Sequence, residues 1–204
     1  MIRKPSIEAD PSLASRFRGG GLLLVGGPPF GGKSLLASRL AEVLPYAVKL
    51  EAVDNLARPT ERWYPYGPTC DALTRPASKM LSAAQSIWWE HGDDERPAII
   101  VCARFESPGM RRRACGLARR MQAPFLFVEA RSSNVRALRR LSRMILEPSE
   151  MERRIGNYER AIGRYQRVDG RERSALPCVL LGRVSTDLDA AVDKVLVAWA
   201  TRRR

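Results

Sequence analysis

A glycine-rich segment with one lysine and one hydroxyl carries the clearest chemical signal in the chain. It reads Gly27-Pro28-Pro29-Phe30-Gly31-Gly32-Lys33-Ser34, which matches the pattern GxxxxGK[ST] at every fixed position. Glycine lets backbone amides approach a phosphate, and a helix that starts at Lys33 would direct its positive end at the same anion. The Lys33 ammonium would neutralise the β- and γ-phosphates, and the Ser34 hydroxyl would ligate Mg²⁺. The pattern therefore predicts a P-loop that binds a nucleoside triphosphate.

The expected cofactors are ATP and Mg²⁺, and their binding residues share one loop and the first turn of the helix after it. They are Gly27, Pro28, Pro29, Phe30, Gly31, Gly32, Lys33, Ser34 and Leu35. The context supports the motif, because an apolar strand over residues 21–25 precedes it and an amphipathic helix over residues 33–44 follows it. The alternative is a glycine-rich turn between strand and helix that binds no ligand.

Asp54 is the expected catalytic carboxylate and, with Ser34, the expected metal ligand. It follows a strand predicted over residues 47–53, and this end of the sheet would face the γ-phosphate. A carboxylate there could accept the proton of an attacking hydroxyl or hold a water on Mg²⁺. The alternative is a turn residue, since Asp54-Asn55 is also good turn chemistry. Glu51, three residues earlier, would point to the opposite face of an extended strand and ranks below Asp54.

An arginine-rich helix is the expected source of cations for a transferring phosphate. On a helix over residues 133–146, Arg136, Arg139 or Arg140, and Arg143 recur at helical spacing and share a face. Like charges on one face repel, so an anion would stabilise them, and the planar guanidinium can donate two hydrogen bonds to one phosphate. We expect Arg140 and Arg143 to be catalytic, together with Lys33. The alternative is a solvated helix face.

The apolar segments predict an α/β fold with five parallel strands and helices on both faces. The expected strands cover residues 21–25, 47–53, 98–103, 124–130 and 177–181. The expected helices cover residues 33–44, 77–91, 110–121, 133–146 and 148–167, with a last helix starting at residue 185 or 186. We expect a flexible lead-in over residues 1–20, then one domain over residues 21–204 with a lid around residues 131–167. The long aromatic loop over residues 55–75 would either line an acceptor pocket or plug the core.

Composition and charge narrow the class of protein. Over 204 residues the net charge is +13, and the excess lies in the second half: residues 1–102 hold 12 Lys+Arg against 11 Asp+Glu, and residues 103–204 hold 23 against 11. A basic surface attracts phosphates, so nucleic acid is a candidate partner beside ATP and a hydroxyl acceptor. The polar first 18 residues predict no secretory signal, and no apolar run is long enough to span a membrane. Four cysteines without CxxC spacing favour reduced thiols and a cytoplasmic location.

The chain resembles the small P-loop kinases, the group of gluconate kinase, shikimate kinase, adenylylsulfate kinase and the polynucleotide-kinase-like predicted kinases. The resemblance rests on the P-loop and, over residues 21–200, on the order and spacing of the elements. It implies strand order 2-3-1-4-5. It also implies that residues 104–113, which include Arg111, contact the phosphoryl acceptor, and that residues 136–143 form the lid.

The sequence departs from this family at the third strand. Many of these kinases carry an aspartate near the end of that strand, where this chain has Cys102-Ala103-Arg104. Two functions therefore remain open. The first is an ATP-dependent kinase that transfers the γ-phosphoryl group to a hydroxyl of a small metabolite or of a nucleic-acid 5′ end, with Asp54 in the carboxylate role. The second is a regulatory nucleotide-binding P-loop protein with little or no turnover.

Overall fold

Five parallel strands form the centre of the molecule in a computed structural model. The model describes residues 20–44, 46–51, 75–92, 95–131, 133–144, 147–182, 184 and 186–201. The strands are β1 (Gly21–Gly26), β2 (Ala47–Glu51), β3 (Ala98–Cys102), β4 (Phe125–Arg131) and β5 (Cys178–Gly182). Their spatial order is β2-β3-β1-β4-β5, and every neighbouring pair is parallel. The predicted fold class and strand order are both confirmed.

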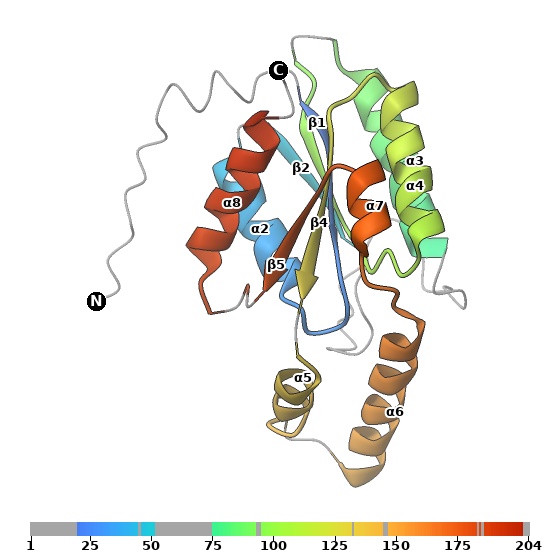
Figure 1. Cartoon of the computed structure of the whole chain (residues 1–204), viewed down its shortest axis with the longest axis vertical. Helices are drawn as coiled ribbons and strands as arrows, with labels where there is room; N and C mark the ends of the chain where they lie inside the picture. Colours follow the sequence, from blue (N-terminus) through green and yellow to red (C-terminus); the bar gives the residue numbers. More distant parts are fainter. Residues whose placement is uncertain are drawn as a thin grey trace.

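Helices cover both faces of the sheet (Figure 1). Helices α2 (Lys33–Val43) and α8 (Leu188–Thr201) lie on one face. Helices α3 (Arg75–Glu90), α4 (Pro108–Arg120) and α7 (Gly170–Ala175) lie on the other. Helices α5 (Asn134–Leu141) and α6 (Pro148–Arg164) lie beyond the end of β4, clear of both faces. Among the described residues, no helix is both long and apolar enough to cross a bilayer.

Strand β1 lies in the middle of the sheet, and all six of its residues are consequently buried. Successive side chains of a strand point to opposite faces. Leu23 and Val25 accordingly pack with α2 and α8, whereas Leu22 and Leu24 pack with α3 and α4. Strand β1 pairs with β3 on one side and β4 on the other. Its carboxyl end therefore delivers the chain to the middle of the sheet edge, where the loop over residues 27–32 begins.

The element boundaries differ from the predicted ones mainly around the lid. Helix α5 ends at Leu141 rather than near residue 146, and α6 ends at Arg164 rather than near residue 167. Helix α7 was not predicted, because its residues carry no apolar stripe of helical period. It is a single short helix capped by Asp169, whose side chain accepts a hydrogen bond from the backbone N–H of Glu172.

Several predicted features lie outside the described residues. These are the lead-in before residue 20, the aromatic loop up to residue 74, and the carboxylate of Asp54. The side chain of Arg140 also lies outside the described part, although its backbone belongs to α5.

Candidate nucleotide site

The predicted P-loop lies at the carboxyl end of β1 and packs against the end of β4. A Cβ atom at Gly27 or at Gly31 would collide with the backbone carbonyl oxygen of Ala130. Gly27 and Gly32 also have positive φ angles of 137° and 89°, a region that L side chains rarely adopt. The glycines therefore allow the loop to turn tightly against β4 and to deliver the chain into α2.

Lys33 starts α2 and is oriented by the loop itself. Its Nζ donates a 2.9 Å hydrogen bond to the carbonyl oxygen of Pro28, and the residue is buried. The backbone N–H of Gly31 donates to the same carbonyl oxygen at 3.3 Å. No side chain caps the N-terminus of α2 at Gly32. The ammonium and the positive end of the helix dipole thus lie together, which is the electrostatic requirement for a phosphate site.

A carboxylate lies next to the expected metal-binding hydroxyl, and it belongs to Glu51. The Ser34 hydroxyl, in the first turn of α2, lies close enough to the Glu51 carboxylate to lower its pKa. Lys49 donates to Glu51 Oε2 at 2.9 Å, and the Cys102 thiol donates to Oε1 at 3.8 Å. Glu51 and Cys102 are register partners at the ends of β2 and β3. The edge strand therefore supplies a carboxylate beside the position where β3 carries a thiol.

The surroundings of Glu51 favour its ionised form. Burial raises the pKa of this carboxyl, but hydrogen bonds from Lys49 and Ser34, with the charge of Lys49, outweigh it and hold the pKa below its usual range. Glu51 is consequently an anion at neutral pH. Hard oxygen ligands suit Mg²⁺, so the Ser34 hydroxyl and the Glu51 carboxylate fit this cation chemically. Within the described ranges, no group of three or more His, Cys, Asp or Glu side chains could hold a metal ion.

The sequence ranks Glu51 below Asp54, and this ranking stays a prediction because Asp54 lies outside the described residues. The alternation of side chains along a strand was applied relative to Asp54, a residue outside the described part. Glu51 lies near the P-loop because the face of β2 that carries it is turned towards α2 and its Ser34. The sequence could have indicated Glu51 through the expected strand order 2-3-1. This order places the end of the second strand next to the end of the third.

Helices α5 and α6 pack together beyond the sheet and contact the P-loop through Phe30. Ala137 and Leu141 of α5 form a small buried cluster with Tyr158 of α6, and Phe30 packs against this cluster. The rings of Phe30 and Tyr158 lie 5.9 Å apart. Phe30 has a φ of 59°, a conformation uncommon for a bulky residue. The P-loop therefore extends one aromatic side chain towards the predicted lid.

Two arginines of the predicted lid, Arg139 and Arg143, are exposed to solvent. Arg139 is exposed on α5, Arg136 is partly exposed, and nothing is described of the Arg140 side chain. Arg143 is exposed and lies in the turn after α5, because the helix ends at Leu141. Arg143 therefore does not share a helical face with Arg136 and Arg139 as the spacing predicted. That these arginines clamp a phosphate stays a prediction.

A buried carboxylate fixes the C-terminal end of α6 to the sheet. Glu129 of β4 is 0% exposed and accepts a 2.9 Å hydrogen bond from the Tyr165 hydroxyl. Arg131 donates to the other oxygen of Glu129 at 2.8 Å and to the carbonyl of Val168 at 3.2 Å. Burial and the neighbouring Glu129 charge raise the pKa of Tyr165, so its hydroxyl stays protonated and keeps donating. Glu129 therefore joins the base of the lid to a strand that contacts the P-loop.

Arg111, within the segment that the family resemblance places near the acceptor, is buried in the fold. The side chain is 0% exposed, and its guanidinium makes two 2.6 Å hydrogen bonds to the Glu172 carboxylate. It also donates to the carbonyl oxygens of Phe105 and Gln166, each at 2.9 Å. All of these partners belong to the protein, so Arg111 joins α4 to α7 and is not free to contact an acceptor.

No family model and no curated protein sequence matches the chain. Solved structures do resemble it over almost its whole length. Kti12 from Chaetomium thermophilum, in complex with ADP-AlF3, has a TM-score of 0.60 and 17% identity, covering 89% of this chain and 98% of that chain. A gluconokinase from Sinorhizobium meliloti 1021 has a TM-score of 0.55 and 16% identity, covering 90% and 93%. A sugar kinase from Janibacter sp. HTCC2649 has a TM-score of 0.53 and 14% identity, covering 90% and 95%.

These structures confirm the resemblance to small P-loop kinases at the level of the fold. At identities of 14% to 17%, this similarity shows the fold alone. The chemistry is therefore argued from the chain's own residues.

Proposed function

We propose that this protein is an ATP-dependent phosphotransferase that moves the γ-phosphoryl group of ATP to a hydroxyl acceptor. The observation that carries the proposal is the group formed by Lys33, Ser34 and Glu51. It combines a buried ammonium, a hydroxyl in the first turn of α2 and an ionised carboxylate at one edge of the sheet. Phosphoryl transfer needs little covalent chemistry from a protein, and it depends on such positioned charges.

Each of these residues has a defined task in the proposed reaction. Backbone amides over residues 27–32 and the Lys33 ammonium hold the phosphates of ATP. The Ser34 hydroxyl and the Glu51 carboxylate hold Mg²⁺ with the nucleotide's oxygens, and the cation supplies charge neutralisation at the phosphates. Asp54, which follows the end of β2 by three residues in the sequence, accepts the proton of the acceptor hydroxyl. Kinases of the same fold, and one neighbour solved with ADP-AlF3, support a nucleotide in this place.

Helices α5 and α6 act as the lid in this proposal, within the predicted region of residues 131–167. They contact the P-loop through Phe30 and lie at the carboxyl edge of the sheet (Figure 1). Arg140 and Arg143 would approach the γ-phosphoryl oxygens when the lid closes over the nucleotide. Arginine in this role stabilises the charge that spreads over the transferring group.

A second candidate is a nucleotide-binding regulatory protein with little or no turnover, and Cys102 favours it. The thiol at the end of β3 is neutral, and it donates a hydrogen bond to Glu51. A thiol cannot supply the negative charge that an aspartate would bring to the same position. The two candidates differ in whether bound ATP loses its γ-phosphate to an acceptor.

An acceptor screen with γ-labelled ATP distinguishes the two candidates. Purified protein is incubated with labelled MgATP and pools of metabolites or 5′-hydroxyl oligonucleotides, and labelled products are separated from ATP. We expect acceptor-bound label with the parent protein and a loss of about 10³-fold for Arg143→Ala if that side chain stabilises the transferring group. Arg164→Ala, an exposed arginine at the end of α6, is the matched control. ATP binding without transfer to any pool would favour the regulatory candidate.

A further inference from the structure

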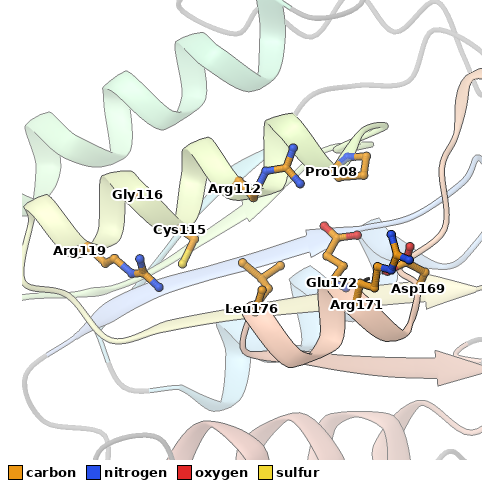
Figure 2. Close-up of a pocket in the computed structure, with 10 residues that line it drawn as sticks. Pro108, Arg112, Cys115, Gly116, Arg119, Asp169, Arg171, Glu172 and Leu176 are labelled. Carbon is orange, nitrogen blue, oxygen red and sulfur yellow. Dashed lines mark hydrogen bonds between the residues drawn. The ribbon is translucent and has the colours of Figure 1, made fainter.

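A basic groove lies between α4 and α7, and no residue of the P-loop lines it (Figure 2). It has a volume of about 490 Å³ and is lined by ten residues of α4, of α7 and of the two caps of α7, Asp169 and Leu176. Three of them are exposed arginines: Arg112 and Arg119 from α4, and Arg171 from α7. The structure gives none of the three an ion pair with a carboxylate of the described residues. The groove therefore presents three guanidinium groups that remain free to bind a ligand.

The acidic groups in the groove do not neutralise these arginines. Glu172 is buried and forms both of its short hydrogen bonds with Arg111, so this pair contributes no net charge. Asp169 is exposed, and one of its oxygens accepts the N-terminal hydrogen bond of α7. When the Arg111–Glu172 pair is counted as neutral, the three arginines that line the groove face one remaining negative charge, that of Asp169. An anionic ligand is the electrostatic complement of this surface.

The spacing of the arginines selects a long anion over a small one. Arg112 and Arg119 are seven residues apart on α4, which places them about 10 Å apart along the helix axis. Figure 2 shows Arg112 near the Pro108 end of the groove, on the side where Asp169 and Arg171 lie, and Arg119 at the other end. A single phosphate cannot reach both ends. A nucleic-acid strand carries one phosphate per nucleotide, so a short stretch of strand presents successive anions over this distance.

The surroundings of the groove extend the same charge. Neither helix exposes an acidic side chain. The two helices together expose six arginines, which are Arg112, Arg113, Arg119, Arg120, Arg171 and Arg173. Between the arginines the groove floor is made of small and apolar groups, among them Cys115, Gly116 and Leu176. Arginine forks donate paired hydrogen bonds to phosphate oxygens, and an uncharged floor accommodates sugars and bases between phosphates.

We propose that the groove between α4 and α7 binds the phosphate backbone of a single-stranded nucleic acid, with Arg112, Arg171 and Arg119 as the phosphate contacts. No residue of the P-loop lines the groove, so its occupancy can be tested apart from the proposed phosphotransfer. It explains why the excess of arginine falls in the second half of the chain, where both helices lie. Affinity at this surface is electrostatic and falls as salt rises.

The test is fluorescence anisotropy with labelled 12-nucleotide RNA and DNA, over a series of salt concentrations, using the full chain. The triple variant Arg112→Gln/Arg119→Gln/Arg171→Gln is compared with Arg160→Gln/Arg164→Gln/Lys194→Gln, which removes the same charge from exposed positions of α6 and α8. We expect the first variant to lose at least about tenfold in affinity and the second much less. The slope of log affinity against log salt should fall by about 2 for the first variant, from three lost phosphate contacts on a single strand.

A second variant guards against misfolding of the triple one. A Cβ on Gly116 would meet only Arg120 Nη1 at 3.8 Å, so Gly116→Glu adds a carboxylate to the groove without a clash. It should also weaken oligonucleotide binding, while Gly116→Gln, of the same size without the charge, should weaken it less. Excess MgATP should not displace the oligonucleotide. Equal effects of groove and control variants would overturn the proposal. So would displacement by MgATP, or equal binding of a labelled poly-glutamate of the same length.

Discussion

At the scale of single residues, the candidate site has a carboxylate at the end of β2, the strand from which the sequence also predicted one. Cys102 occupies the end of β3, and Glu51 lies opposite it in register with its oxygens directed at Ser34 and the thiol. This arrangement places negative charge next to the expected metal-binding hydroxyl without an acid on β3. Asp54 and Glu51 consequently have separate tasks in the account. Asp54 is assigned to the acceptor, and Glu51 to the metal side of the nucleotide.

Replacing Glu51 by glutamine should uncouple nucleotide binding from turnover. The amide keeps the shape and removes the charge, so ATP should still bind at the loop and at Lys33. Turnover should fall by tenfold or more, and more Mg²⁺ should be needed for half-maximal activity. Steady-state kinetics at several Mg²⁺ concentrations measures both effects. Glu42→Gln, an exposed carboxylate on α2 that pairs with Arg39, is the control. Unchanged kinetics of Glu51→Gln would remove it from the site.

The ionisation of Glu51 gives a prediction about pH. Its pKa lies below the usual value because hydrogen bonds from Lys49 and Ser34, with the charge of Lys49, outweigh the effect of burial. A lowered pKa in the folded state stabilises the fold above the unfolded pKa, and that stabilisation is lost as the pH falls through the folded value. Lys49→Met should therefore raise the Glu51 pKa, which a carboxyl ¹³C NMR titration measures. It should also raise the pH at which the folded protein begins to lose stability in acid. An unchanged titration would mean that Lys49 does not hold the charge.

At the scale of elements, the contact between Phe30 and α6 connects the P-loop to the lid. Phe30 is the one loop side chain that packs with the buried cluster of Ala137, Leu141 and Tyr158. Its positive φ directs the ring out of the loop. Elsewhere α5 and α6 are attached through Glu129 at the base of α6 and through the chain ends of both helices. Among the described residues, the contact through Phe30 and the one through Glu129 therefore connect the lid to the P-loop and to the sheet.

Phe30→Ala should loosen the lid while leaving the core of the domain intact. Amide hydrogen exchange should rise over α5 and α6 and stay unchanged over β1 and α2. Turnover should fall more than ATP affinity, because the loop amides and Lys33 are retained. Val197→Ala, which truncates an exposed side chain on α8, is the control for a lost apolar group. Equal exchange in α5 and α6 of both variants would show that the ring does not hold the lid.

The comparison of predicted and observed elements shows which helices and strands a local sequence pattern can predict. Runs such as Leu22–Val25 and Ile99–Cys102 are apolar on both faces, as buried parallel strands must be, so their positions were predictable. Helix α7 was not predictable from a stripe, since it is held by the long-range pair Arg111–Glu172 and by its Asp169 cap. The end of α5 at Leu141 likewise lacks a Gly or Pro signal at that position.

At the scale of the whole molecule, the buried pair Arg111–Glu172 ties one face of the fold together. Its members come from α4 and α7, 61 residues apart, and Arg111 also holds the carbonyls of Phe105 and Gln166. Removing one partner of a buried pair leaves the other charge uncompensated. The same pair sets the walls of the groove between α4 and α7, because Glu172 lines it and Arg111 lies beneath.

Arg111→Met should destabilise the protein by about 3–5 kcal/mol, since Glu172 would remain buried without its cation. Urea unfolding followed by circular dichroism measures the change. The double variant Arg111→Met/Glu172→Met should recover much of the loss, because both buried charges are then gone. Arg112→Met, one residue along on the exposed side of α4, should change the free energy of unfolding by less than about 0.5 kcal/mol. Equal stabilities of Arg111→Met and Arg112→Met would contradict the structural role.

The overall architecture followed from the sequence, whereas the site followed only in part. Alternation of strands and helices predicted the sheet, and the family resemblance predicted its order. The positions of Lys33 and Ser34 came with the motif, because its spacing fixes them at a helix start. Glu51 depends on which strands become neighbours, and Arg111 on burial that no local pattern records. Such residues are determined by tertiary packing, which is where single-sequence arguments end.

The most direct test of the account is isothermal titration calorimetry of MgATP into the parent protein and Lys33→Ala. Lys33 is the buried cation in the loop, held by the Pro28 carbonyl and replaceable without touching the apolar core. We predict saturable binding of one MgATP by the parent protein, weaker binding when Mg²⁺ is removed, and a loss of about 100-fold or more in affinity for Lys33→Ala, with an unchanged circular dichroism spectrum. Equal MgATP affinity of the two proteins, or no binding by the parent protein, would contradict the account.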